Sequence, residues 1–135
     1  MSIAISHVPT LKIGQNVTFA NAAFVADGST AEGGDGTGPS PHEIYDAALG
    51  ACKAMTILWY ARRKSIPVDD VHVTVTHDAS QERSGRYVIS AAITVRGALS
   101  EEQLAELRTV ADKCPVHKLM TEVTTDIQTS LALER

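Results

Sequence analysis

Two cysteines are the side chains of this chain best suited to covalent chemistry. Cys52 lies in an apolar stretch, and Cys114 directly precedes a proline. A free cysteine usually behaves as a small buried hydrophobe. A thiolate that attacks a peroxide becomes a sulfenic acid, however, and a nearby second thiol can convert that acid into a disulfide. The two cysteines are therefore a candidate redox pair, provided that folding brings them together.

Two other kinds of site would use some of the same residues. Cys114 and His117 could bind a metal together with Cys52 or His42, but a structural zinc site needs four ligands and no second ligand pair has a suitable spacing. A cysteine hydrolase would pair one of the thiols with His117, but the chain has no local signature of such an enzyme. We rank both below the redox pair.

Residues 40–64 are expected to form one long helix that carries Cys52. Ser40 and Glu43 fit a Ser-x-x-Glu capping box, and the proline between them suits the first helical position. Three basic residues at positions 62–64 suit the C-terminal end of the helix dipole, and Pro67 prevents the helix from continuing.

The faces of this helix predict a partner. Asp46, Lys53 and Tyr60 share one narrow polar stripe, and nearly all other positions are apolar. About half of the surface of a typical surface helix is polar. Because this helix has much less polar surface, we expect it to be buried on most sides. The chain's own sheet can cover one face, and the other face suggests a second subunit.

The remaining elements follow from periodicity and turn residues. We expect two or three strands in 3–26, a glycine-rich connection in 27–40, a hairpin of strands 70–76 and 86–96 with His77 at its exposed end, a helix over 100–113, a short helix over 116–122 and a final strand over 123–131. The stripe Leu104, Leu107, Ala111 and Cys114 should face the core. At the start of the short helix, Lys113, His117 and Lys118 should favour a Cys114 thiolate.

Length and charge narrow the class of protein. At 135 residues the chain is expected to be a single domain, 1–135. A net charge of −4 argues against nucleic-acid binding. We find no signal peptide and no apolar run long enough to span a membrane, so we expect a cytoplasmic protein.

Two segments, 38–52 (Gly-Pro-Ser-Pro-His-Glu-Ile-Tyr-Asp-Ala-Ala-Leu-Gly-Ala-Cys) and 113–118 (Lys-Cys-Pro-Val-His-Lys), together resemble the OsmC/Ohr family of organic hydroperoxide reductases. The order of elements is similar over nearly the whole chain, and the pattern is closest to the less characterised OsmC-like branch. The resemblance implies an α+β, OsmC-like fold with an antiparallel sheet and a long central buried helix, assembled as an intertwined homodimer.

The resemblance also implies roles for individual residues. Cys52 would be the peroxidatic nucleophile and Cys114 the resolving thiol, which reverses the order that the local argument for Cys114 favours. Glu43 would lie near the peroxidatic thiol. In the Ohr branch of the family a glutamate directly follows the proline, whereas here His42 occupies that position and Glu43 comes next. The family's N-terminal arginine has no counterpart, since the first arginine is Arg62. An external dithiol would reduce the disulfide, with no metal or organic cofactor.

A second function, of another class, competes with this one. A dimeric binding protein for a small apolar or acyl ligand would hold its pocket between subunits and use its cysteines structurally. A Cys52 that resists alkylation and forms no disulfide after peroxide treatment would favour binding.

Overall fold

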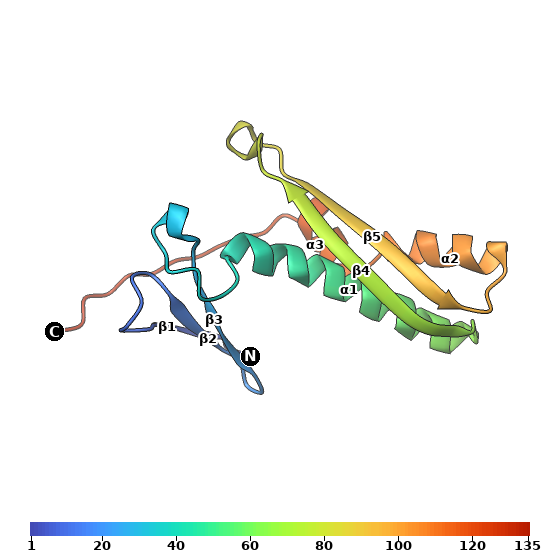
Figure 1. The fold of residues 1–135 in the computed structure, drawn as a ribbon, viewed down its shortest axis with the longest axis horizontal. Coiled ribbons are helices and arrows are strands. Elements are labelled where there is room, and N and C mark those ends of the chain that lie inside the picture. Colours follow the sequence, from blue (N-terminus) through green and yellow to red (C-terminus); the bar gives the residue numbers. More distant parts are fainter. The chain divides into compact units, whose positions relative to one another are not determined.

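The computed structural model describes residues 1–135 as five strands and three α-helices (Figure 1). In chain order these are β1 (Ala4–His7), β2 (Gln15–Thr18), β3 (Ala23–Ala26), α1 (Pro41–Lys64), β4 (Val68–Asp78), β5 (Val88–Gly97), α2 (Glu101–Ala111) and α3 (Pro115–Thr121), with short 3-10 turns at Thr30–Glu32 and Glu82–Ser84. The strands form the sheets β1-β2-β3 and β4-β5. The expected α+β class is confirmed. None of the helices combines the length and apolarity needed to cross a bilayer.

The chain divides into two compact units. The first unit comprises Met1–Ala48 and Val75–Ser90, and the second comprises Leu49–Thr74 and Ala91–Arg135. Helix α1 and the β4-β5 hairpin each contribute residues to both units.

The first unit contains the antiparallel sheet β1-β2-β3. β2 is its central strand, and its residue Val17 pairs with Ile5 on one side and Phe24 on the other. Val17 is buried, and the ring of Phe24 stacks on that of Phe19 with 5.8 Å between centroids. The expectation of two or three strands in this region is confirmed, with three.

The glycine-rich segment after β3 is held by one buried carboxylate. Asp27 accepts hydrogen bonds from the backbone N–H groups of Gly28, Asp35 and Thr37 and from the Thr37 hydroxyl, at 2.7–3.3 Å. The Thr37 hydroxyl is the largest of the influences that lower the pKa of Asp27. A Cβ on Gly34 would lie 2.1 Å from the Gly28 carbonyl oxygen, so glycine is required for this close approach. The segment is therefore a specifically bonded loop rather than only a connection.

Helix α1 begins and ends where the sequence predicts. The Glu43 N–H donates to the Ser40 hydroxyl oxygen (3.2 Å), and the Ser40 N–H donates to the Glu43 carboxylate (3.0 Å), which completes the capping box. The helix ends at Lys64, and Ser65 follows with a left-handed φ of 53°. With these two ends, Cys52 lies in the middle of the helix.

The faces of α1 are inverted relative to a surface helix. The polar residues Asp46 and Lys53 are buried, whereas Met55 and Trp59 expose 69% and 60% of their surface. The polar stripe predicted from the sequence is thus buried, and part of the apolar surface of the helix is exposed to solvent. Burial on most sides is not achieved within one chain.

The second unit has its core between α1, α2 and the hairpin. Its buried members are Ile57, Ala61, Ile66, Leu107 and Ala111, with hairpin residues Val71, Ile93 and Val95 packed against them. α2 begins with a capping box between Ser100 and Gln103. The expected hairpin and core-facing row are confirmed, except that Leu104 is 46% exposed.

The expected final strand over 123–131 is wrong. Residues 124–135 form neither strand nor helix. Val123, Ile127 and Leu131 are exposed, Leu131 at 98%. Alternating side chains do not make a strand unless a neighbouring strand accepts its backbone hydrogen bonds, and this chain provides none for the segment.

Candidate functional site

The second unit brings the two cysteines together. Cys52 lies in the middle of α1, and Cys114 is the N-cap of α3, with extended backbone angles (φ −64°, ψ 144°) before Pro115. The N–H of Val116 donates to the Cys52 sulfur at 3.5 Å. Both thiols are free, and Cys52 lies near enough to Cys114 to raise the pKa of Cys114. Two free thiols this near to each other are candidates for a disulfide.

The two thiols differ in exposure. Cys52 is half-buried, whereas Cys114 is 0% exposed. Burial is the main influence on the pKa of Cys114 and raises it, and the Cys52 side chain raises it further. The N–H of His117 and the charge of Lys53 oppose that rise. The expectation that the helix start and nearby cations favour a Cys114 thiolate is therefore wrong, because burial of the sulfur outweighs them.

A buried lysine adjoins this site. Lys53, next to Cys52 in the chain, is 5% exposed, and its Nζ donates to the Ala111 carbonyl oxygen (2.8 Å) and to His117 Nδ1 (2.9 Å). The carboxylate of Asp112 lies 3.9 Å away. The sequence places Lys53 in the polar stripe of α1 but does not predict that its ammonium group is buried. The one signal for this position is a lysine inside an apolar helix directly after a cysteine.

The lysine also bears on the two alternative sites. A nitrogen that accepts a hydrogen bond from an ammonium group has no free lone pair for a metal or for a thiol proton, and His117 Nδ1 is such a nitrogen. No group of three His, Cys, Asp or Glu side chains in the chain is placed to hold a metal ion. The arrangement therefore fits thiol chemistry better than a Cys114–His117 metal site.

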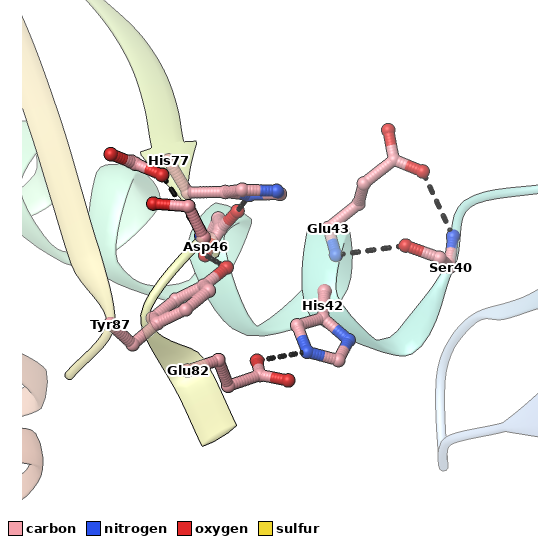
Figure 2. Close-up of polar contacts among 9 residues, drawn as sticks. Ser40, His42, Glu43, Asp46, His77, Glu82 and Tyr87 are labelled. Carbon is pink, nitrogen blue, oxygen red and sulfur yellow. Dashed lines mark hydrogen bonds and ion pairs between the residues drawn. The ribbon is translucent and has the colours of Figure 1, made fainter. Parts of the chain in front are cut away.

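The third candidate residue, Glu43, belongs to the first unit. Its carboxylate accepts the Ser40 N–H at the start of α1 (Figure 2). Both cysteines lie in the second unit. Within its own unit, Glu43 completes the helix cap.

The first unit holds a polar cluster that the sequence did not indicate. Asp46 is buried and accepts hydrogen bonds from His77 Nδ1 and, at 2.8 Å, from the Tyr87 hydroxyl (Figure 2). His42 Nε2 lies 2.5 Å from a Glu82 carboxylate oxygen. The His77 and His42 rings lie 5.3 and 5.8 Å from that of Tyr87. His77 is exposed near the end of β4, as expected, and is in addition paired with a buried carboxylate, which the sequence did not predict.

We predict that Asp46→Asn weakens this cluster in two measurable ways. The buried charge accepts two hydrogen bonds, so its removal should lower the free energy of unfolding by about 1–3 kcal/mol. Burial, with the hydrogen bond and the charge of Asp46, raises the pKa of Tyr87 to about 12. That pKa should fall in the variant, as seen by tyrosinate absorbance. Glu106→Gln is the control, since Glu106 bonds Tyr60 instead; an unchanged Tyr87 titration in Asp46→Asn would contradict the assignment.

The chain thus has an α+β fold in which two free thiols lie near each other. The family model described as OsmC-like protein matches residues 34–130, a span that includes both cysteines. The chain belongs to the OsmC family, as the sequence motifs indicated. No curated protein matches the chain.

Solved structures share the fold. An OsmC-like protein from Mycoplasma pneumoniae superposes with a TM-score of 0.72 at 19% identity, over 91% of this chain and 89% of that one. An organic hydroperoxide resistance protein OsmC from Legionella pneumophila gives 0.64 at 18% identity, over 90% of each chain. The organic hydroperoxide resistance protein OhrB of Bacillus subtilis superposes with a TM-score of 0.60 at 20% identity, over 90% of each chain. The OsmC-like fold is thereby confirmed.

Proposed function

We propose that the protein is a thiol-dependent peroxidase that reduces organic hydroperoxides. The Cys52 thiolate attacks the distal peroxide oxygen, the O–O bond breaks, and an alcohol leaves after taking up a proton. Cys52 is then a sulfenic acid. Cys114 attacks its sulfur, an S–S bond replaces the S–O bond, and water leaves. An external dithiol reduces the disulfide by thiol exchange and is itself oxidised.

The proximity of Cys52 and Cys114 is the observation that carries this proposal. The N–H of Val116, two residues after Cys114, donates to the Cys52 sulfur, although Cys52 lies within α1 and Cys114 at the start of α3. The different exposure supports the order of the steps. The half-buried Cys52 is the thiol that a peroxide would reach, whereas Cys114 is fully buried.

The comparisons support the substrate class. Two structures that share the fold are named as organic hydroperoxide resistance proteins. By this proposal the present chain acts on the same class of compound. A cycle that ends in reduction by a dithiol suits a reducing compartment such as the cytoplasm.

We also propose that the working form is a homodimer. Met55 and Trp59 leave an apolar strip of α1 open to solvent, and large exposed apolar patches mark interaction sites. A second copy of the chain would cover this strip. Glu43 and His42 are candidates to line the peroxide site in that assembly, besides the cap and the Glu82 pair that they form in one chain.

Mass spectrometry of the intact protein tests the chemistry. We expect one equivalent of tert-butyl hydroperoxide to remove two hydrogens from the reduced protein and to link the Cys52 and Cys114 peptides. Cys52→Ser and Cys114→Ser serve as controls, because neither can form the link. A parent protein that stays reduced, or that oxidises without a Cys52–Cys114 link, would rule out the proposed cycle.

One observation favours the alternative of ligand binding. The second unit contains a cavity of about 390 Å³ whose lining is mostly apolar and includes Ile57, Ile93, Val95, Leu104 and Leu107, together with the charged side chains of Glu101 and Arg108. A mostly apolar cavity of this size suits a small apolar ligand. Alkylation at neutral pH separates the two functions: a peroxidase requires a reactive Cys52, whereas a binding protein does not.

A further inference from the structure

The position of Lys53 is not explained by the peroxidase proposal alone. A lysine side chain is almost never fully buried, because taking an ammonium group out of water costs several kcal/mol unless it is well paired. Lys53 is buried, and its nearest carboxylate, that of Asp112, is 3.9 Å away on a side chain that is 58% exposed. Its two close partners are uncharged acceptors, the Ala111 carbonyl oxygen and His117 Nδ1.

These partners flank Cys114 in the chain. Ala111 ends α2, and His117 lies in the first turn of α3, so Lys53 binds the segment that carries Cys114 from both sides. The backbone N–H of Val116, in the same segment, donates to the Cys52 sulfur at 3.5 Å. Since Lys53 follows Cys52 on α1, a single side chain ties the helix of one thiol to the segment of the other.

We propose that Lys53 is a positioning residue that controls the rate of disulfide closure, the step in which Cys114 attacks oxidised Cys52 and forms the S–S bond. Its ammonium group holds residues 111–117 against α1, and its positive charge favours the Cys114 thiolate, which is the attacking species. Cys114 then supplies the electron pair of the S–S bond, and the hydroxide leaving Cys52 takes up a proton to form water. This inference rests on the proposed peroxidase cycle for its biological meaning, but the closure step can be tested without a peroxide.

The size of the effect follows from thiol chemistry. An opposite charge near an ionisable group moves its pKa by about one unit or more. One unit is a tenfold change in thiolate fraction, partly offset because a more basic thiolate is a better nucleophile. Removing the Lys53 charge should therefore slow closure at neutral pH about threefold or more. It should also move the pH of half-maximal closure up by about one unit.

Three variants separate charge from packing. Lys53→Met removes the charge and the hydrogen bonds but keeps the apolar stem, and Lys53→Gln keeps a donor without the charge. Lys113→Met is the matched control, because Lys113 adjoins Cys114 in the chain but is exposed, where a charge is screened by water and salt. Circular dichroism confirms that each variant is folded, and Lys53→Gln keeps the test available if Lys53→Met does not fold.

The experiment measures disulfide closure in two ways across a pH series. One arm oxidises the reduced protein with diamide, and the other uses tert-butyl hydroperoxide; acid-quenched samples are read by mass spectrometry. We expect both Lys53 variants to close more slowly, with the higher pH midpoint, and Lys113→Met to match the parent. If the parent reacts with diamide but not with the peroxide, the proposed function fails while Lys53 is still tested. Closure at the parental rate and pH midpoint in both Lys53 variants would overturn the inference.

Discussion

Replacing Cys52 with serine is expected to abolish turnover of organic hydroperoxides. The serine hydroxyl has nearly the same size but is far less nucleophilic than a thiolate at neutral pH. Loss of a covalent nucleophile commonly costs several orders of magnitude in kcat, so we expect a fall of at least about a thousandfold. Peroxide consumption is measured with dithiothreitol as the reductant.

Cys114→Ser is the matched variant, because it removes the second thiol and keeps the first. Without added reductant it should consume one equivalent of peroxide per Cys52 and then stop, leaving a sulfenic acid that dimedone traps. This behaviour separates the two roles, since a purely structural pair would give both variants the same phenotype. If both consume peroxide as the parent does, the enzyme proposal is wrong.

Met55→Lys is expected to dissociate the proposed homodimer. Met55 is 69% exposed in the single chain and lies on the same open strip of α1 as Trp59. An unpaired ammonium group buried between two subunits costs about 3 kcal/mol or more. That cost corresponds to at least about a hundredfold weaker association. Sedimentation velocity over a concentration series measures it.

The control for this variant is Met55→Leu, which keeps an apolar side chain of similar volume. It should sediment as the parent does. A parent that is monomeric at all concentrations would exclude the dimer, and a Met55→Lys variant that stays dimeric would place the interface elsewhere. Peroxidase activity of both variants then tells whether the site needs the second subunit.

Local sequence signals determined most elements of the fold. The Ser40–Glu43 cap, the Ser100–Gln103 cap and the alternation along the hairpin act over a few residues, so the helices and strands could be predicted within one or two positions. The same kind of local pattern predicted a strand over residues 123–131, and that prediction is wrong. A strand depends on a hydrogen-bonding neighbour, which no local pattern supplies.

For the candidate site, the sequence determined which residues could react, and the two cysteine motifs identified the family. Only the tertiary structure decided their surroundings: the inward position of Lys53, the pairing of Asp46 with His77, and the complete burial of Cys114, which the sequence predicted only to face the core. Burial and charge pairing arise from contacts between segments that are distant in the chain. Desolvation by those contacts changes a pKa more than neighbours in sequence do, which is why Cys114 looked activated in the sequence and is enclosed in the fold.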